Sequence, residues 1–220
     1  RNIMKKARQV TAVSQFVANM AKQTLCDIPI QVIYNGVNTK LFYPKNKFRE
    51  KEKPFRLLYI GAWKYLKGVD LLAPIMDGLG NKFELYYTGG TVAQKDKYKM
   101  PSNMYDLGKL TQDQVILEMQ NADAFLFPSR SEGFGLVVTE AMACGLPVIA
   151  LQGTAIDEII NHEVTGYLVK DTNEAVQTLK QIYNNEALLN QLSISANTIA
   201  ASRFCEQSML NAYISLYNSL

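Results

Sequence analysis

The chain has 220 residues, of which 48% are hydrophobic and 20% are charged, and its net charge at pH 7 is +3. These proportions are typical of a globular protein with one full domain and an appendage, and so small a charge does not indicate a nucleic-acid partner. The cysteines Cys26, Cys144 and Cys205 lie far apart in the sequence. They form neither a disulfide framework nor a metal cluster, which favours a reducing, cytoplasmic setting.

The first residues, RNIMKKAR, are basic and lack the features of a signal peptide. Arg1, Lys5, Lys6 and Arg8 could contact anionic lipid, so peripheral membrane contact is one expectation. A solvated surface is the preferred interpretation. No apolar run reaches the ~18–20 residues that a membrane-spanning helix needs. A chain that begins within a longer protein explains this start most simply.

Two short strands are expected near the start of the chain. Residues 9–14 alternate weakly, and Ser14 is expected to cap a helix that runs to Lys22. Residues 28–34 form the second strand, with Pro29 at its start or edge because proline has no N–H to donate. Residues 45–53 (KNKFREKEK) are charged and lack apolar periodicity, so they predict a surface loop.

Between residues 55 and 169, strand-like apolar runs alternate with helical patterns. Predicted strands occupy residues 56–61, 83–88, 103–107, 125–127, 148–151 and 166–169. Predicted helices occupy residues 69–76, 111–121, 136–144 and 155–160. Thr111 is the expected N-cap of the second of these helices. The alternation predicts an α/β fold, in which a Rossmann-like parallel sheet carries helices on both faces.

Three further helices are expected after the last strand, at residues 173–184 (capped by Asp171), 186–200 and 204–220. The last of them is amphipathic, and one face carries Met209, Leu210, Tyr213, Leu216 and Tyr217. Such a stripe indicates core or interface rather than a cofactor site. His162 lies in the turn before the last strand. We expect a positive charge there to suit a helix end rather than to take part in catalysis.

The most informative stretch is FLFPSRSEGFGLVVTEAMACGLPVIAL, residues 125–151. It combines a strand, a glycine-containing turn, a helix and a second strand, which is an arrangement that binds anions through the free N–H groups of the first helical turn. Glu132 precedes the helix and has a simple explanation, because an acid there offsets the helix dipole. Glu140 lies on an apolar face with Val137 and Cys144, so its carboxylate requires a partner, for which a hydroxyl-bearing ligand is one candidate.

Glu-Gly-Phe-Gly, the seven residues between the two glutamates, and Ala-Met-Ala-x-Gly-x-Pro-Val-Ile-Ala closely resemble the signature of retaining, family-4 type glycosyltransferases. The resemblance implies the C-terminal half of the two-domain GT-B fold. It also implies that the donor sugar and diphosphate contact Glu132, Phe134, Gly135 and Leu136, and that the donor ribose contacts Glu140.

The loop GAWKYLKG after the first strand of the sheet resembles the family's diphosphate-binding loop. By this resemblance Gly61 and Lys67 contact the donor phosphates, and Lys67 joins Glu132 as a catalytic residue because a cation neutralises charge on the leaving nucleotide. Ala62 stands where the family often has arginine, so half of the usual basic pair is missing. Lys64 is a candidate substitute, and a solvated lysine is an equal alternative.

The family's nucleobase rests near the strand predicted at 103–107, so Tyr105 and Leu107 are the implied ribose and base contacts. Gly89 and Gly90 follow another strand at the ligand-binding edge, although a plain turn explains them equally well. Because Lys67 and helix N–H groups can neutralise the diphosphate, we expect no metal and no other cofactor. The single histidine of the sequence offers no zinc-site spacing.

By resemblance, residues 1–36 are the end of an N-terminal acceptor domain with the interdomain connection, residues 37–202 are the nucleotide-sugar-binding domain, and residues 203–220 form a helix that crosses back to the N-terminal domain. The implied reaction transfers a sugar from a nucleotide sugar to a saccharide or lipid-linked saccharide, with retention of configuration, in polysaccharide or glycoconjugate biosynthesis. Because almost all of the N-terminal domain is missing, we expect these residues alone to bind nucleotide without turnover.

Two alternatives belong to other functional classes. One is a non-catalytic nucleotide-binding module that kept the fold, which the Ala62 departure favours. The other is a hydrolase that uses Glu132 and Glu140 as paired carboxylates. That reaction requires the two groups to face each other about 5–9.5 Å apart across a sugar. Their positions before and inside one helix suit a single extended ligand better.

Overall fold

The computed structural model of the protein describes residues 6–24, 28–45, 52–89 and 100–220. Several residues for which the sequence carried predictions lie outside these ranges: Arg1, Lys5, Cys26, Gly90 and most of the loop predicted at 45–53. Among the described residues, no helix combines the length and the apolarity needed to cross a membrane.

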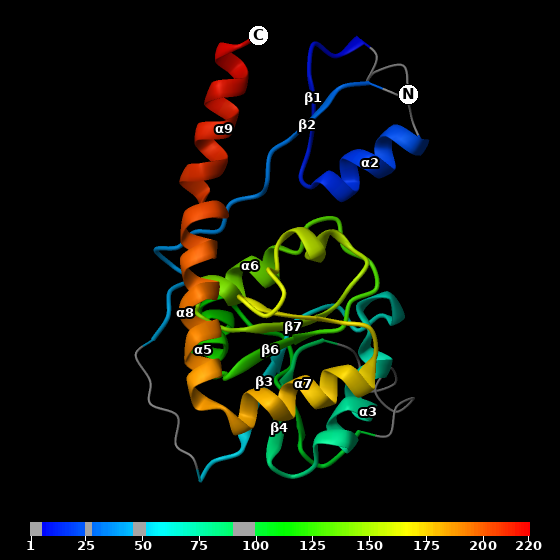
Figure 1. Ribbon diagram of the computed structural model, residues 1–220, viewed down its shortest axis with the longest axis vertical. Helices are drawn as coiled ribbons and strands as arrows, with labels where there is room; N and C mark the ends of the chain where they lie inside the picture. Colours follow the sequence, from blue (N-terminus) through cyan, green and yellow to red (C-terminus); the bar gives the residue numbers. More distant parts are fainter. Residues whose placement is uncertain (1–5, 25–27, 46–51, 90–99) are drawn as a thin grey trace.

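The larger unit is built on a six-stranded parallel sheet with the order β5-β4-β3-β6-β7-β8 (Figure 1). Its strands are β3 (Phe55–Tyr59), β4 (Phe83–Tyr87), β5 (Met104–Asp106), β6 (Ala124–Phe127), β7 (Val148–Leu151) and β8 (Gly166–Val169). The chain starts in the middle at β3, moves outward to β5, and then returns to place β6 on the other side of β3. The predicted Rossmann-like parallel sheet is confirmed, and its order reverses between β3 and β6.

Helices cover both faces of this sheet, as the sequence predicted. The helices are α3 (Val69–Leu79), α5 (Gln112–Asn121), α6 (Leu136–Ala143), α7 (Thr172–Asn184) and α8 (Glu186–Arg203). Alternate strand residues enter opposite cores: Leu57 packs with α3 and α7, whereas Leu58 packs with α5 and α6. This two-residue period places apolar side chains on both faces, so the strands are buried as in other parallel sheets.

Side-chain caps start two of these helices at the predicted residues. Thr111 and Gln114 form a reciprocal capping box at the start of α5, in which the Thr111 side chain accepts from the Gln114 N–H and the Gln114 side chain accepts from the Thr111 N–H. Asp171 accepts from the N–H of Glu174 at the start of α7. These predictions succeeded because a cap depends only on neighbours within one turn. Two short 3₁₀ turns, η1 (Tyr65–Lys67) and η2 (Ala155–Glu158), complete the unit.

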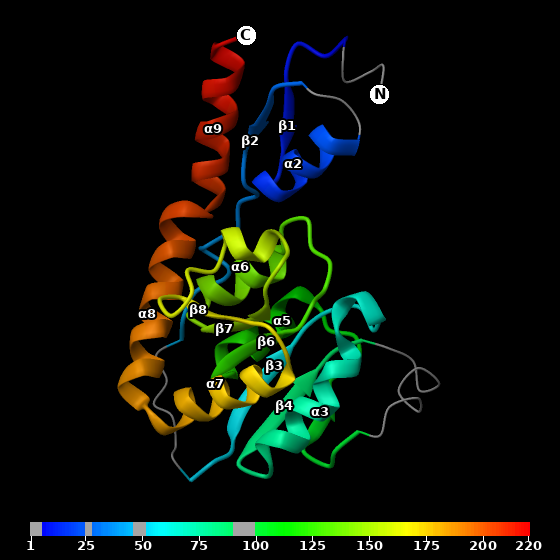
Figure 2. The same ribbon diagram turned by 45° about the vertical axis from the view of Figure 1, so that its right-hand side comes forward.

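The smaller unit contains two parallel strands, β1 (Val10–Ala12) and β2 (Ile30–Val32), together with α2 (Gln15–Thr24). The last helix, α9 (Glu206–Asn218), extends away from the large sheet beside this unit in both ribbon views (Figure 2). The chain passes between the units twice, and the two passages lie side by side. There the N–H of Val37 donates to Phe204 O at 2.7 Å, and the N–H of Glu206 donates to Val37 O at 3.1 Å.

The apolar stripe predicted on the last helix is only partly covered. Leu216 is buried, whereas Leu210 and Tyr217 are 50% and 69% exposed. Because α9 lies beyond the edge of the large unit, its apolar residues do not reach the sheet core (Figure 1).

The structure places His162 in the turn before β8. Its Nδ1 accepts a hydrogen bond from the Leu168 N–H at 3.1 Å. The edge of the ring also packs against Tyr167. His162 thus helps to hold this turn, and its expected charge stays a prediction.

Candidate functional site

The loops after β3 and β6 meet at the carboxyl edge of the sheet, where the strand order reverses. Lys67 comes from the first loop and Glu132 from the second, 65 residues later, and Lys67 Nζ lies 2.5 Å from Glu132 Oε1. Their side chains are 30% and 11% exposed. In open α/β folds ligands bind at this reversal point. The structure therefore brings the two predicted catalytic residues together as a largely sheltered ion pair.

Tyr59, at the end of β3, supports the Lys67 loop from below. Its hydroxyl donates to Ala62 O at 3.2 Å and lies 3.5 Å from Lys67 O. Burial raises the pKa of Tyr59, and the charge of Glu132 raises it further. The hydroxyl consequently stays protonated and keeps its role as a donor.

Arg130 joins the two loops from the side. Its guanidinium binds both oxygens of Asp70 at 2.7 and 2.8 Å and lies over the ring of Tyr65 at 4.3 Å. The Arg130 backbone N–H also donates to Leu66 O at 2.8 Å. A bidentate arginine–carboxylate pair combined with ring stacking fixes geometry better than a single contact. Arg130 thus fixes the η1 turn that carries Lys67.

Two glycines allow the loops to approach each other closely. Gly68 has φ +71°, and a Cβ added there would collide with the carbonyl of Pro128. Gly135 has φ +91°, and an added Cβ would lie 2.5 Å from Ile156 Cδ1. Both positions have a left-handed backbone; the backbone of Pro128 leaves no space for a side chain at Gly68, whereas at Gly135 the end of the Ile156 side chain would have to shift. The site depends on them for its shape.

Helix α6 begins at Gly135, directly above the end of β6. It has no side-chain cap and no acidic residue in its first turn. The N–H groups of Leu136 and Val137 and the positive end of the dipole are therefore available to an anion, as expected for the strand–turn–helix pattern.

A hollow of about 500 Å³ lies over this helix start. All of the residues that the sequence assigned to the donor sugar and diphosphate line it: Gly61, Lys67, Glu132, Phe134, Gly135 and Leu136. Ala62 also lines it and supplies no cation. Lys64 does not line it and is exposed, so it is not seen as a substitute for the missing arginine.

Residues of the small unit complete this hollow, a contribution that the sequence analysis missed. Val13 and Asn35 both line it. Asn35 stands in the Asn-Gly segment that follows β2. The sequence did contain a signal for this contribution, because a polar residue directly after a parallel strand lies at the edge of the sheet where ligands bind.

A second hollow, of about 400 Å³, adjoins the first at Ile60 and lies over the ends of β4 and β5. Thr88, Gly89, Asp106 and Lys109 are among its lining residues. Lys109 had not been predicted, although a cation directly after a strand and its glycine is a readable signal.

The two residues predicted to contact ribose or base differ in position. The Tyr105 ring stacks on Tyr86 with centroids 4.9 Å apart, and its hydroxyl donates to Glu84 Oε1 at 3.3 Å. It therefore lies on the sheet face, outside the lining of the second hollow. Leu107 follows β5 beside that hollow, where its N–H donates to Tyr87 O at 2.8 Å and its side chain packs against the core.

Glu140 lies one turn inside α6 and is half-buried. Burial raises the pKa of its carboxyl group. Within the described part of the chain, this carboxylate has no hydrogen-bond or ion-pair partner. A desolvated acceptor without a protein donor is what a ligand hydroxyl would satisfy. Its role as a ribose contact remains a prediction. Across the described ranges, no group of three or more histidine, cysteine, aspartate or glutamate residues is placed to hold a metal ion.

Comparison with known proteins identifies relatives of this arrangement. The model of the family described as glycosyl transferases group 1 matches residues 44–198. An uncharacterized glycosyltransferase of Methanocaldococcus jannaschii is 30% identical over 189 residues, covering 84% of this chain and 52% of that protein. N-acetyl-alpha-D-glucosaminyl L-malate synthase of Bacillus anthracis is 28% identical over 225 residues, covering 94% of this chain and 58% of that protein. The chain thus spans about half the length of the curated relatives it matches.

Solved structures share the fold. Sucrose-phosphate synthase of Thermosynechococcus elongatus has a TM-score of 0.86 at 24% identity, covering 99% of this chain and 59% of that one. Anabaena HepE in complex with UDP and glucose has a TM-score of 0.87 at 20% identity, covering 100% of this chain and 65% of that one. These likenesses confirm the expected Rossmann-like half of a GT-B fold. Because the family model matches more than half of its residues, the chain belongs to the family of glycosyl transferases group 1.

Proposed function

We propose that the chain is the donor-binding part of a retaining glycosyltransferase that moves a sugar from a nucleotide sugar to a saccharide or lipid-linked saccharide. The observation that carries the proposal is the Lys67–Glu132 pair at the mouth of the uncapped helix α6, inside a hollow at the sheet's reversal point. The nucleotide sugar is favoured by the family, and a UDP-type donor by the HepE structure that holds UDP and glucose.

In this proposal the diphosphate lies over the first turn of α6. The Lys67 ammonium then interacts with the leaving phosphate as well as with Glu132. The backbone N–H groups and Lys67 supply the neutralising charge without a metal or another cofactor. Glu132 orients the sugar. Glu140 accepts from the ribose, and the base occupies the second hollow beside Lys109.

The reaction breaks the bond between the sugar's anomeric carbon and the diphosphate oxygen, and it forms a bond from that carbon to the acceptor oxygen. The acceptor hydroxyl passes its proton to the departing phosphate. Attack on the face that the nucleotide leaves retains the configuration. The acceptor site belongs to an N-terminal domain, and we propose a role in polysaccharide or glycoconjugate biosynthesis at the cytoplasmic side of a membrane.

The proposed division places residues 1–36 with the acceptor domain, residues 37–202 with the donor domain, and residues 203–220 in a returning helix. The adjacent passages at Val37 and Phe204–Glu206 support this division because both joints lie at one place. These residues alone are then expected to bind nucleotide without turnover.

A thermal-shift titration with UDP, GDP, ADP and their common sugar conjugates tests the proposal. A ligand at about 100 times its dissociation constant adds about 2.7 kcal/mol of stability. A shift selective for one base, and weakened by Glu140→Ala, supports the donor site. No shift with any nucleotide, for the chain or for a protein that includes the N-terminal domain, contradicts it.

The non-catalytic binding module is the second candidate. It is favoured by Ala62, because Lys67 is then the only cation among the described residues that line the first hollow. The variant Glu132→Ala distinguishes the two candidate functions. In a binding module this variant leaves nucleotide affinity nearly unchanged and there is no activity to lose. In a transferase with the N-terminal domain present, it abolishes transfer.

A further inference from the structure

The start of helix α2 is capped by a residue from the other unit. Glu158, at the end of η2, accepts the Gln15 N–H on Oε2 at 2.8 Å and the Phe16 N–H on Oε1 at 2.6 Å. These residues are 143 and 142 positions away in the sequence. Ser14 accepts the N–H of Val17 at 3.1 Å. The first three N–H groups of α2 are thus satisfied, two of them by a carboxylate at the positive end of the helix.

The first turn of α2 is also hydrogen-bonded, through Ser14, to the loop that carries Glu132. The buried Ser14 hydroxyl donates to Gly133 O at 2.7 Å. Because Ser14 is the residue before Gln15, any shift of this helix start moves the donor of that bond. The position of Gly133, directly beside Glu132, is therefore coupled to the cap on α2.

The η2 turn also contacts the loop that carries Glu132, which we call the donor loop (residues 132–135). The Ala155 N–H donates to Glu132 O at 3.4 Å. Ile156 packs where a side chain on Gly135 would otherwise lie. One four-residue turn thus contacts the Glu132–Gly135 segment at its start and holds the small unit at its end through Glu158.

Tyr34 links the same carboxylate to the connection between the units. Its hydroxyl donates to Glu158 Oε2 at 3.1 Å, and its ring lies 6.1 Å from that of Phe134. The neighbouring Asn35 lines the first hollow, as does Val13. Val13 precedes Ser14, and Asn35 follows Tyr34. Both residues of the wall that the small unit contributes to the hollow are therefore adjacent to residues of the Glu158 contact network.

We propose that Glu158 is a positioning residue that clamps the small unit onto the donor loop, and that this clamp sets both the Glu132–Gly135 turn and the wall formed by Val13 and Asn35. The consequence for ligands rests on the proposed function, whereas the clamp does not. Since that wall borders the hollow assigned to the sugar, releasing it weakens binding of a nucleotide sugar more than binding of the nucleotide alone.

The test compares Glu158→Gln with Asp157→Asn, a matched control whose carboxylate accepts the nearby Gly153 N–H and makes no hydrogen bond or ion pair with the small unit among the described residues. Amide hydrogen exchange of the chain is followed by NMR. We expect the Gln15 and Phe16 amides to exchange about tenfold faster in Glu158→Gln, since hydrogen bonds to a charged acceptor are roughly twice as strong as neutral ones. The amides of residues 133–135 should also exchange faster, and the exchange rates of Asp157→Asn should match those of the unchanged chain. Glu158→Asp, which keeps the charge, replaces Glu158→Gln if the latter does not fold.

Binding of UDP and UDP-glucose is then measured by calorimetry. In Glu158→Gln we expect UDP-glucose to bind about fivefold to tenfold more weakly, and UDP within about twofold of the unchanged chain. Unchanged exchange at residues 15 and 16, or equal losses for both ligands, overturns the proposal. If the unchanged chain binds neither ligand, a UDP donor site in these residues alone is contradicted, and exchange at 133–135 alone decides whether the clamp positions the loop.

Discussion

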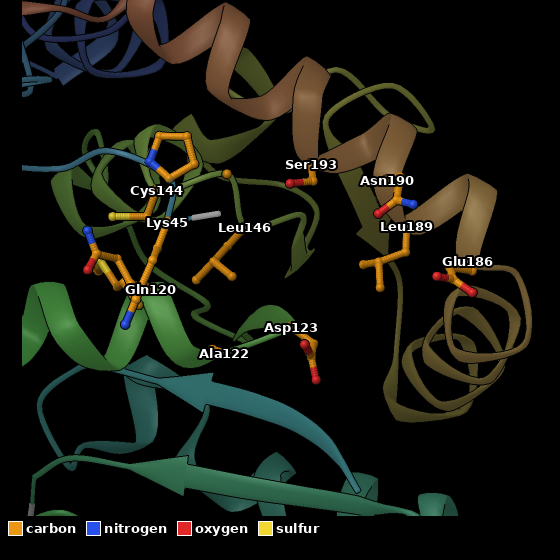
Figure 3. Close-up of a pocket in the computed structure, with 13 residues that line it drawn as sticks. Lys45, Gln120, Ala122, Asp123, Cys144, Leu146, Glu186, Leu189, Asn190 and Ser193 are labelled. Atoms are coloured by element: carbon orange, nitrogen blue, oxygen red, sulfur yellow. The ribbon is translucent and has the colours of Figure 1, made fainter. Parts of the chain in front are cut away.

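The two edges of the large sheet are both hollowed, yet they differ in chemistry. At the carboxyl edge lie the Lys67–Glu132 pair and the uncapped start of α6. At the amino edge, shown in Figure 3, a hollow lies among the ends of α5 and α6 and the start of α8. Its labelled residues include Gln120, Asp123, Cys144 and Glu186.

The difference follows from the parallel arrangement of the strands. Each helix that returns from one strand to the next starts at the carboxyl edge and ends at the amino edge, so the positive helix ends gather on one side and the negative ends on the other. The amino-edge hollow receives the carbonyl ends of α5 and α6 and the carboxylates of Asp123 and Glu186, and its cationic groups are limited to Lys45 and the start of α8 among the described residues. Hollow shape alone therefore does not select an anionic ligand, whereas helix polarity does.

Replacing Glu132 should have the largest effect and should separate the two edges. In a protein that includes the N-terminal domain, we expect Glu132→Gln to lower the transfer rate by about 10²–10³, because an oriented charge at the reacting centre is lost. Glu186→Gln, at the amino edge, is the matched control and should keep the full rate. Sugar transfer from UDP-glucose measures both, and equal rates for the two variants would contradict the assignment of the site.

The close contact between the β3 and β6 loops is tested by Gly68→Ala. We expect a loss of about 3 kcal/mol in the free energy of unfolding, because about 1–2 kcal/mol for the left-handed backbone adds to the collision with Pro128. Gly108→Ala is the comparison, since Gly108 has a similar positive φ of +66° and nothing within 4 Å of an added Cβ. Urea unfolding compares the two. Equal losses would show that the contact with Pro128 costs nothing.

Glu140→Gln should weaken nucleotide binding and yet stabilise the free chain. Burial raises the pKa of Glu140 in the folded state, so its charged form destabilises the fold at pH 7, and this cost vanishes as pH falls and both states are protonated. The unfolding midpoint should rise at pH 7 and stay unchanged well below the unfolded pKa of about 4.3.

The same variant should bind UDP about tenfold more weakly, because a charged acceptor is replaced by a neutral one. Calorimetry on Glu140→Gln measures this, and Glu163→Gln, at a side chain 69% exposed, is the control. A variant that is destabilised at pH 7, or that binds UDP normally, would remove Glu140 from the site.

The smallest expected effect is that of nucleotide on Cys144 at the amino edge. Burial, with the nearby charge of Glu140, raises the pKa of its thiol to about 12, whereas the Ser208 hydroxyl lowers the pKa of Cys205. In a Cys26→Ser background, iodoacetamide at pH 8 should modify Cys205 first and Cys144 far more slowly. Saturating UDP should leave the Cys144 rate unchanged. Protection of Cys144 by UDP would place the ligand at the wrong edge.

Local chemistry made much of the fold predictable. Thr111 and Asp171 marked helix starts because a cap acts within one turn. The alternation of strands and helices predicted the parallel sheet because that connection requires a crossover. The glycine-bracketed start of α6 was readable for the same reason: its geometry depends on adjacent residues.

The sequence by itself thus determined the elements, the fold class and the family signature around Glu132. Only the tertiary structure decided which distant residues meet: Lys67 with Glu132, Glu158 with the start of α2, and Val13 within the hollow. It also turned Tyr105 onto the sheet face and left the stripe of α9 only partly covered. Helical and strand periods act over a few residues, whereas these pairings depend on the order of strands in the sheet and on the docking of two units, which no local period encodes.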